Sequence, residues 1–511
     1  MTNGDKLADQ GPDTDINKEV LATLKAMLGA QVISYYSSLT KSENLSLAEE
    51  AKAFLILMWA LNLIQSKMPS RFVSYGPSRH LVIRTEDNSF AGKAYSSPQR
   101  YSDDAHNIAG FHKINRERSR LLREITNSDL PYIGLPDYET DVLGGIPVRT
   151  FKPIQGELLY YKTIAGTATL EDYIKAAVQI TRIQEEGKIH RRRLKLEDVV
   201  RSRQAGQPDY FTGRFKDVFF GQLLEFSGIQ LSALEQEIMM RNWQVSVAPH
   251  LIRAHYNGFN GYYFDGNPRH SIFTPGEGIV SIDFEYKIIV PFLLGLANLM
   301  SSGLTTDGKP YISPPDQIKI LDRALLEIEF VRALKSGFKD KAARIHRYIS
   351  ERYESGTYDL SGEESDDFYR FVGRDDKGFG IEQRERFLAA WPYALLDRNA
   401  AWIGHKARYI SFVHELEEAK FGFRDQLKQI LAQSNHDSSE IVGMLGDTKF
   451  ELSNPIQQYA AEQRQHLGQI VDILWQLYES SPNRDSKRYT PLIMLYNAFN
   501  KLQQNSYFTK N

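Results

Sequence analysis

Two aspartates stand at the ends of a predicted β-hairpin in the middle of the chain. Asp265 precedes the short apolar run 271–273, and Asp283 follows a second run, 279–282. Between the runs lies the sequence TPGEG (residues 274–278), whose proline and glycines are typical of a hairpin turn. A hairpin brings its two ends together, so we expect these carboxylates to lie side by side. Carboxylates accept protons and bind hard cations, which makes the pair the first candidate for chemistry.

The stretch Tyr263–Glu285 resembles the catalytic loop and metal-binding segment of the protein-kinase-like superfamily, in its aminoglycoside phosphotransferase and choline kinase branch. That branch has His-x-Asp, four residues, an Asn, a hairpin, and then Ile-Asp-Phe/Trp-Glu. Here the sequence YFD (263–265) stands at one end and IDFE (282–285) at the other. The resemblance implies that Asp265 accepts the proton of an attacking hydroxyl. It also implies that Asp283 holds Mg²⁺ against the phosphates of ATP.

Two positions depart from the pattern of that branch. Tyr263 stands where the branch has His, and His270 stands where it has the metal-binding Asn. Mg²⁺ prefers hard oxygen ligands, so imidazole is a poor substitute, and Mn²⁺ is an alternative metal. His270 is therefore either a metal ligand or a hydrogen-bonding residue that shapes the loop. Asn267 is a second source of an oxygen ligand.

Short strand-like runs precede the catalytic stretch, at residues 71–75, 81–85, 90–95, 146–152 and 157–162. By the resemblance they form the nucleotide-holding sheet of a small lobe, in which Lys93 reaches the α- and β-phosphates. Glu117, in a predicted helix over 108–125, takes the place of the acid that positions this lysine. The alternatives are a solvated strand residue for Lys93 and a surface ion pair for Glu117, which stands between two arginines.

The remaining nucleotide contacts are also implied by the resemblance. The chain has no Gly-x-Gly-x-x-Gly loop at the first turn of the sheet, so Gly76, Ser78 and nearby backbone amides are the candidates for phosphate contacts. The residues from Tyr161 to Ala165 take the place of the hinge that meets the adenine.

The predicted fold class is α+β, a bilobal protein-kinase-like fold with a small β-rich N-lobe, a helical C-lobe and helical extensions at both ends. The predicted boundaries are a disordered tail over 1–16, an N-terminal helical extension over 17–69, the N-lobe over 70–165, the C-lobe with the catalytic loop over 166–335, and a helical C-terminal extension over 336–511. The 3.6-residue spacing of apolar residues predicts helices over 18–28, 46–67, 170–186, 231–254, 286–300, 315–335, 338–353, 381–433 and 454–479. Ser46 and Glu49 form a predicted capping box.

Composition limits the class of protein. Of 511 residues, 42% are hydrophobic and 25% charged, as in ordinary globular proteins, and the net charge of −2 gives no field that favours nucleic acid. The absence of cysteine excludes disulfides and thiolate sites and favours a reducing cytoplasm. The N-terminus lacks the features of a signal peptide, and the longest apolar run, 53–64, is shorter than the roughly 20 residues of a membrane span.

The sequence thus predicts an ATP-dependent kinase that phosphorylates a hydroxyl of a small molecule. One alternative is a pseudokinase-like module that binds nucleotide or a partner without phosphotransfer, favoured by His270 and by the long extensions. Another is a nucleotidyl transferase on the same fold. The helical C-terminal region is expected to hold substrate specificity, a protein partner or a homo-oligomer interface. The basic run 188–195 is read as a solvated turn or as a site for an acidic or phosphorylated substrate.

Overall fold

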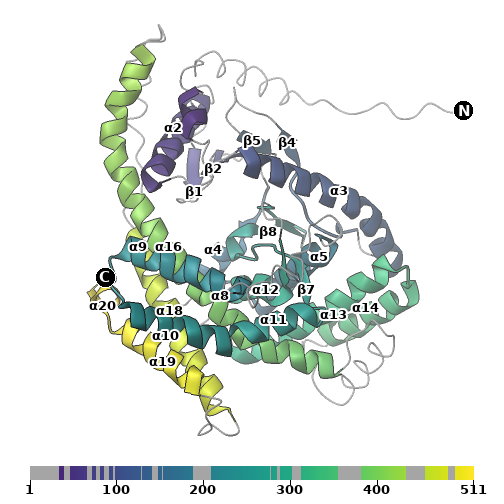
Figure 1. Cartoon of the computed structure of the whole chain (residues 1–511). Helices are drawn as coiled ribbons and strands as arrows, with labels where there is room; N and C mark the ends of the chain where they lie inside the picture. Colours follow the sequence, from purple (N-terminus) through teal and green to yellow (C-terminus); the bar gives the residue numbers. More distant parts are fainter. Residues whose placement is uncertain are drawn as a thin grey trace, which may run out of the picture. The chain divides into compact units, whose positions relative to one another are not determined.

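The computed structural model describes residues 34–39, 46–65, 72–75, 81–85, 91–95, 98–127, 129–140, 148–151, 154–187, 209–276, 278–284, 288–301, 312–354, 381–432, 455–481 and 490–510. The chain forms two compact units (Figure 1). Unit 1 comprises Met1–Ser102, Asp137–Pro153 and Ser411–Pro455, and unit 2 comprises Asp103–Pro136, Ile154–Ile410 and Ile456–Asn511. Small antiparallel sheets beside many helices make the chain α+β, as predicted. The predicted tail, the helix over 18–28, Gly76, Ser78 and the basic run 188–195 lie outside the described residues.

Unit 1 is built on an antiparallel sheet of five strands in the order β1-β2-β3-β5-β4. The strands are β1 (Phe72–Tyr75), β2 (Leu81–Thr85), β3 (Ala91–Ala94), β4 (Tyr138–Thr140) and β5 (Val148–Phe151). The predictions near 71–75, 81–85, 90–95 and 146–152 are therefore confirmed. The strand that sequence reading missed is β4, which pairs with β5 at the edge of the sheet.

One helix of unit 1 follows directly from its sequence. α2 (Leu47–Gln65) begins with the predicted capping box. The Glu49 carboxylate accepts the Ser46 backbone N–H at 2.9 Å, and the Ser46 hydroxyl accepts the Glu49 N–H at 3.3 Å. Phe54 of α2 packs edge-on against Phe412 of α16 (Ile381–Ala432), with ring centroids 5.6 Å apart. No helix within the described parts of the chain has the length and apolar character needed to cross a bilayer.

The predicted strand over 157–162 is wrong beyond its second residue. Only β6 (Glu157–Leu158) is extended, and it pairs with β8 (Ser271–Phe273) in unit 2. α4 (Leu159–Ile164) begins at the next residue. Leu159 and Thr163, one helical turn apart, are both buried, and the Thr163 hydroxyl donates to the Leu159 carbonyl at 2.7 Å. A short apolar run fits both a strand and a helix, and packing decides between them.

Unit 2 holds the other strands and most of the helices. Its two small sheets are β6-β8-β9 and β10-β7, with β7 (Asn260–Tyr262), β9 (Ile279–Ser281) and β10 (Ile289–Pro291). Its helical elements are most of α3 (Pro98–Thr126), α5 (Leu170–Glu186), α8 (Tyr210–Arg214), the π-helix η2 (Phe215–Gly221), α9 (Gln222–Ser227), α10 (Ala233–Ser246), α11 (Ala248–Tyr256), η3 (Pro268–His270), α12 (Phe292–Ser301), α13 (Pro314–Lys335), α14 (Lys339–Glu354), the first part of α16, α18 (Pro455–Glu479), α19 (Thr490–Gln503) and α20 (Ser506–Lys510).

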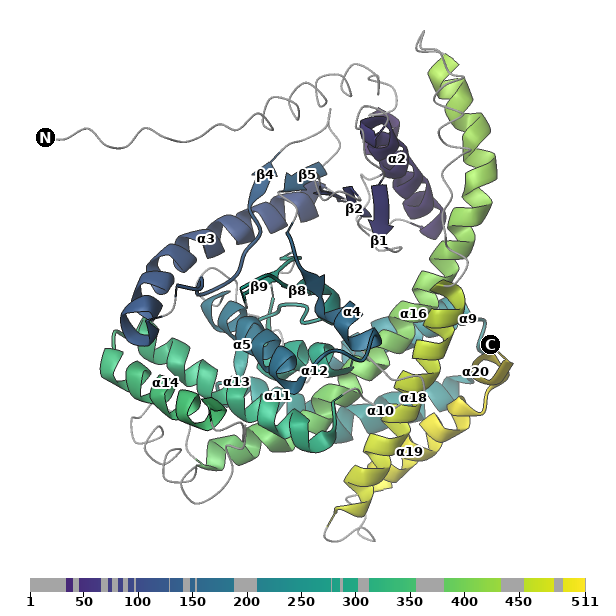
Figure 2. The same ribbon diagram turned by 180° about the vertical axis from the view of Figure 1, so that it is seen from behind.

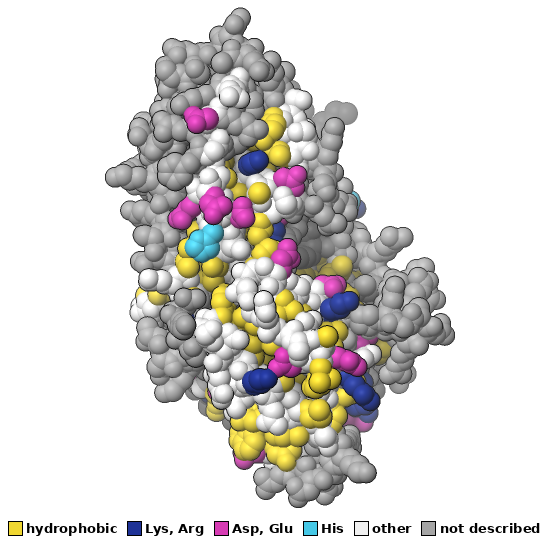
Figure 3. Space-filling view, turned by 60° about the vertical axis from the view of Figure 1, so that its left-hand side comes forward, with side chains coloured by type: hydrophobic (Ala, Val, Ile, Leu, Met, Phe, Trp, Pro, Cys, Tyr) yellow, Lys and Arg dark blue, Asp and Glu magenta, His cyan; other side chains and the backbone are white. Residues whose placement is uncertain are grey.

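The core of unit 2 surrounds α5. This helix packs against α13 and α12, as the reverse view shows (Figure 2). Its predicted bounds are confirmed, and Thr169 and Asp172 form a capping box at its start. α19, which was not predicted as a separate helix, packs against α10. Side chains of both charge signs lie among hydrophobic and polar ones on the face shown in Figure 3.

Three predicted helices needed correction. The helix predicted over 108–125 is α3, which begins at Pro98. The single helix over 231–254 is two helices, α10 and α11, which meet at Val247. Pro249 lies in the first turn of α11, where its missing N–H removes no helical hydrogen bond. The helix over 286–300 begins only at Phe292, because the β-branched Ile289 and Val290 pair with β7 as β10. α16, by contrast, continues through Pro392 as one helix.

Candidate functional site

The hairpin β8–β9 brings together three predicted site residues. β7 leads into the loop that carries Asp265, the turn η3 ends at His270, and β9 ends shortly before Asp283. β8 pairs with β9 through Ser271–Ser281, Ile272–Val280 and Phe273–Ile279. The His270 carbonyl also accepts the Ile282 N–H at 3.0 Å, which extends the pairing to the site. The predicted hairpin and the predicted proximity of the two carboxylates are confirmed.

Asp265 lies almost entirely within the protein, with a side chain that is 16% exposed. Its Oδ1 accepts Asn298 Nδ2 of α12 at 2.9 Å and the Asn267 backbone N–H at 3.3 Å. Burial raises the pKa of the Asp265 carboxyl; the nearby His270 lowers it, and the Asp283 carboxylate raises it further. The site thus holds a carboxylate that is more basic than an exposed one.

His270 lies between the two acids. Its Nδ1 is 3.0 Å from the Asp265 carbonyl oxygen, and its Nε2 is 3.5 Å from Oδ2 of Asp283. A carbonyl oxygen can only accept, so Nδ1 carries a hydrogen, and Nε2 of a neutral ring would present its lone pair to the carboxylate. Such an arrangement is favourable when Nε2 is protonated or when a cation lies between Nε2 and the carboxylate.

Asp283 has a backbone conformation that residues other than glycine rarely adopt. Its φ angle is +76°, in the left-handed region. The next residue, Phe284, is buried and clamped by α3: its N–H donates to Asp104 Oδ1 at 2.9 Å, and its carbonyl accepts Asn107 Nδ2. Its ring lies 5.3 Å from that of Phe111, between centroids. Strain of this kind persists where the surroundings fix it and is concentrated at functional sites.

A pair of glycines lets the loop that carries Asp265 lie against α12. A Cβ atom on Gly266 would lie 2.2 Å from the Gly295 carbonyl oxygen. A Cβ atom on Gly295 would lie 2.7 Å from Gln184 Nε2 and 3.1 Å from the Phe264 carbonyl oxygen. The backbone beside Asp265 therefore approaches α12 as closely as only glycine allows.

Comparisons with known proteins point in one direction. No protein-family model matches the sequence, and neither does any curated protein. Among solved structures, an ethanolamine kinase from Plasmodium vivax matches with a TM-score of 0.35 and 11% identity, over 81% of this chain and 88% of that chain. A choline kinase from Cryptosporidium parvum Iowa II matches with a TM-score of 0.36 and 11% identity, over 75% of this chain and 94% of that one. An aminoglycoside phosphotransferase from Alicyclobacillus acidocaldarius matches with a TM-score of 0.27 and 13% identity, over 69% and 94%.

The likeness is to solved structures only, and it is a likeness of fold. The likeness is distant and concerns the course of the backbone, so it names no substrate for this chain.

In the five-stranded sheet of unit 1, Lys93 is buried on β3. It lies opposite Val82 on β2 and opposite Arg149 on β5. Its Nζ is 4.8 Å from the ring centroid of Tyr95, and the Arg149 guanidinium is 5.7 Å from the same ring. The solvated-strand alternative for Lys93 is wrong, since the side chain is buried. Sequence reading missed Arg149, although its place on a strand next to Lys93 follows once the register is known.

The structure places the other predicted nucleotide contacts as follows. Glu117 lies on α3 with its side chain 66% exposed, and it forms an ion pair with its neighbour Arg118 at 3.4 Å. The buried acid of α3 in unit 2 is Asp104, which sequence reading missed. Tyr161 lies exposed on α4, and Ala165 caps that helix, so the residues proposed for the hinge lie in a helix and at its end. Gly76 and Ser78 lie outside the described residues.

The donors near Asp283 suit a shared cation better than a closed metal site. Among the described residues, no group of three or more His, Cys, Asp or Glu could hold a metal ion by itself. Mg²⁺ bound with nucleotide also takes phosphate oxygens and water, so one or two protein ligands suffice. His270 Nε2 and Asp283 Oδ2 lie 3.5 Å apart, so these two atoms would hold such an ion together. Asn267 is turned away from this role, since its Oδ1 accepts the Arg269 N–H at 3.0 Å.

The site residues that were not predicted from the sequence are buried polar residues on helix faces, which is a weak sequence signal. Asp104, Asn107 and Phe111 recur at helical spacing on one face of α3, and all three are buried. A buried face with two polar residues predicts a polar partner for that face, but not which one. Asn298 lies in the largely apolar helix α12, FLLGLANLMS. Its buried amide likewise predicts a polar partner without identifying it.

Proposed function

We propose that this protein is an ATP-dependent phosphotransferase that phosphorylates a hydroxyl group of a small molecule. The observation that carries the proposal is the pair Asp265 and Asp283 on either side of His270. In this type of chemistry the protein mainly positions the reactants and neutralises charge. Asp265 is largely buried, and Asp283 is held in a left-handed conformation. These two carboxylates, at the ends of one hairpin, fit the tasks of positioning the reactants and neutralising charge.

Asp265 is the proposed proton acceptor. Its burial raises the pKa of the carboxyl, which makes it a better base for an alcohol proton. Asn298 Nδ2 and the Asn267 N–H both donate to Oδ1, so the carboxylate has a fixed orientation. The Nδ1 atom of His270 lies 3.9 Å from Oδ2 of Asp265. The hydroxyl of the acceptor substrate is proposed to meet this carboxylate.

Asp283 and His270 are the proposed residues that hold the metal ion with the nucleotide. A bound Mg²⁺ or Mn²⁺ supplies positive charge to the phosphate oxygens. The Asp283 Oδ2 and the His270 Nε2 are the donors, and Asn267 stays a weaker alternative because its oxygen is engaged within the loop. Imidazole suits transition metals better than Mg²⁺, so Mn²⁺ is the expected preference.

Lys93 is the proposed phosphate contact of the nucleotide. Its burial beside a second cation, Arg149, supports this role, because like charges on opposed strands are favoured when an anion joins them. A role of Glu117 in positioning Lys93, and contacts from Gly76, Ser78, Tyr161 and Ala165, stay predictions from the family resemblance. So do the cytoplasmic location, the five segment boundaries and a partner or homo-oligomer interface in the C-terminal region.

The experiment is ATP turnover by the purified chain with Mg²⁺ and separately with Mn²⁺, beside Asp283→Asn. Asparagine tolerates the left-handed conformation, so this variant removes the charge and keeps the backbone. Metal-dependent turnover that falls by about two orders of magnitude or more in Asp283→Asn supports the proposal. The control is Asp340→Asn, an exposed aspartate on α14. Equal turnover in Asp283→Asn and wild type would sink the proposal.

Labelled ATP distinguishes the types of transfer. Label from the γ-phosphate in the product indicates phosphotransfer, whereas label from the α-phosphate indicates nucleotidyl transfer.

A second candidate is a module that binds nucleotide without transferring phosphate. The observation that favours it is the 3.5 Å approach of His270 Nε2 to Asp283, which a protonated histidine would turn into an ion pair in the place of the metal. A ligand at a thousand times its Kd stabilises the folded state by about 4 kcal/mol, so binding is visible as a thermal shift. A shift with ATP that needs no metal, without turnover, would favour this candidate.

A further inference from the structure

A continuous chain of buried hydrogen bonds joins Asp265 to helix α16. Asn298 Nδ2 donates to Asp265 Oδ1 at 2.9 Å and to the Tyr263 hydroxyl at 3.0 Å. Arg398 of α16 donates from Nη1 to the same hydroxyl at 3.0 Å. Asn298, Tyr263 and Arg398 are all buried. The tyrosine that replaces the family's histidine therefore connects the catalytic loop to a helix far along the chain.

Arg398 is itself fixed by a second set of contacts. Its Nη2 and Nε donate to Asp397 Oδ2 at 2.6 and 3.1 Å. Arg214 of α8 donates to the same oxygen at 2.7 Å. The two guanidinium groups thus share one carboxylate oxygen. Buried charges are tolerated when they are paired and hydrogen-bonded in this way.

We propose that Arg398 is a positioning residue for Asp265, acting through Tyr263 and Asn298. This inference rests on the proposed phosphotransfer function. It assigns to the first part of α16, within the predicted C-terminal extension, a share in building the site. The helix is then part of the catalytic unit and not only a surface for partners.

The physical basis is the limited number of hydrogens on the Asn298 amide. One N–H points to Asp265 and the other to Tyr263, so the tyrosine oxygen fixes the plane of the amide. Arg398 in turn fixes the tyrosine oxygen. If that oxygen is removed, the amide gains freedom to rotate, and the Asp265 carboxylate loses its defined orientation.

Tyr263→Phe is the main test, because it removes one oxygen and keeps the ring. A misplaced catalytic group costs about 100-fold in rate, so we expect kcat to fall by about that factor while KM for ATP is unchanged. Arg398→Met is expected to have a similar effect alone and little further effect in the Tyr263→Phe background, since both break the same chain. Arg398→Lys, which keeps a donor, should restore part of kcat.

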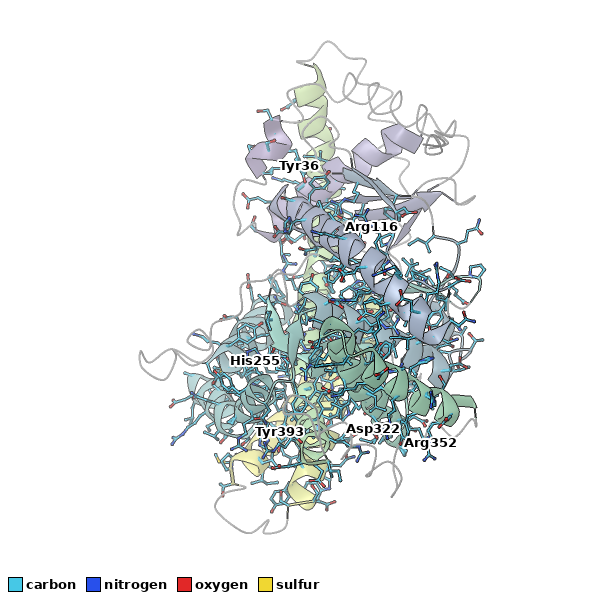
Figure 4. All side chains as sticks on the ribbon, turned by 90° about the vertical axis from the view of Figure 1, so that its right-hand side faces the viewer. Tyr36, Arg116, His255, Asp322, Arg352 and Tyr393 are labelled. Carbon is cyan, nitrogen blue, oxygen red and sulfur yellow. The ribbon has the colours of Figure 1, made fainter. Side chains whose placement is uncertain are left out.

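The matched control is Arg384→Met on the same helix. Arg384 forms a two-pronged, partly buried pair with Asp322 of α13, at 2.7 and 2.6 Å. Asp322 is labelled in Figure 4. Arg384→Met should lower Tm but leave kcat unchanged. An unchanged kcat in Tyr263→Phe, or effects of Tyr263→Phe and Arg398→Met that multiply independently, would overturn the inference.

Hydrogen exchange tests the same inference without activity. Backbone amides of residues 264–270 should exchange faster in Tyr263→Phe and in Arg398→Met than in wild type, and at the wild-type rate in Arg384→Met. If wild type shows no ATP turnover but this exchange pattern holds, the proposed function fails while the link between α16 and the loop stands. If exchange in the loop is unchanged in both variants, the link fails whatever the activity.

Discussion

Nε2 of His270 lies 3.5 Å from Oδ2 of Asp283, and by the sequence resemblance this histidine stands where an asparagine is expected. The same ring is fixed from its other side by the Asp265 carbonyl, 3.0 Å from Nδ1. His270 therefore does not point away from the site. Its imidazole offers a nitrogen donor next to the proposed metal-binding carboxylate, where an oxygen donor is expected. Because imidazole suits transition metals better than Mg²⁺, the site is expected to prefer Mn²⁺.

His270→Asn should change the metal preference of the site. Asparagine offers a hard oxygen, so turnover with Mg²⁺ should rise relative to turnover with Mn²⁺, by about tenfold if the donor contributes about 1.4 kcal/mol. The measurement is the ratio of kcat/KM for ATP with the two metals, in wild type and variant. An unchanged ratio would show that His270 is not a ligand and only shapes the loop.

Asp104→Ala should release Asp283 from its left-handed conformation. The variant leaves the buried Phe284 N–H without its 2.9 Å acceptor, which costs about 1–3 kcal/mol of folding free energy. It should also weaken the binding of Mn²⁺ in the presence of ATP, measured by titration. His106→Ala, at an exposed position of the same helix, is the control. Wild-type metal affinity in Asp104→Ala would contradict the role assigned to the clamp.

Gly266→Ala should displace the catalytic loop from α12. The new Cβ would lie 2.2 Å from the Gly295 carbonyl oxygen, and overpacking of this kind costs about 1–3 kcal/mol. We expect a lower Tm and a lower kcat together. Gly422→Ala is the matched control, because a Cβ there meets nothing within 4 Å, and alanine should stabilise that helix by up to about 1 kcal/mol. Equal effects of the two substitutions would count against the close approach.

Glu329 on α13 should make stability fall as the pH rises. Burial raises the pKa of its carboxyl to about 7, against the opposing effect of Arg332 and Lys341, from an ordinary value of 4.5. The folded state binds this proton more tightly than the unfolded state. The contribution to stability is therefore complete below pH 4.5 and is lost as the pH rises through about 7.

The variant Glu329→Gln removes this proton-binding site. The unfolding free energy of the variant relative to wild type should be greater at pH 8 than at pH 5, by about 1–3 kcal/mol, since each pKa unit corresponds to about 1.4 kcal/mol. The difference in Tm between variant and wild type should therefore be larger at pH 8. Thermal unfolding at both pH values is the measurement, with Glu225→Gln at an exposed position as the control. A difference in Tm that is the same at pH 5 and pH 8 would contradict the assignment.

Where the signal is local, the sequence predicted the structure. The turn TPGEG, the alternating runs beside it and the capping box of α2 act between residues only a few positions apart. The hairpin that joins Asp265 and Asp283 follows from them, and so does the proximity of the two acids. These features are fixed by turn chemistry and by side chain–backbone hydrogen bonds, which any tertiary context would keep.

Where a run of residues fits a strand and a helix equally well, the sequence did not decide between the two structures. The run after Leu158 fits a strand as well as a helix, and it forms α4 because Leu159 and Thr163 are buried on one side of a helical turn. Residues 289–291 fit the start of the next helix as well as a strand, and they form β10 because β7 is present to pair with them. In both cases the partner lies elsewhere in the chain.

By itself, the sequence determined the two acids, the histidine between them and the hairpin that brings them together. Only the tertiary structure decided what holds these residues in place: Asp104 and Asn107 of α3 at the backbone after Asp283, Asn298 of α12 at Asp265, and Arg398 of α16 behind Tyr263. Their partners are distant in sequence, and a polar side chain on a buried helix face shows that it needs a hydrogen bond but not with whom. That choice is made by the packing of the helices around the loop.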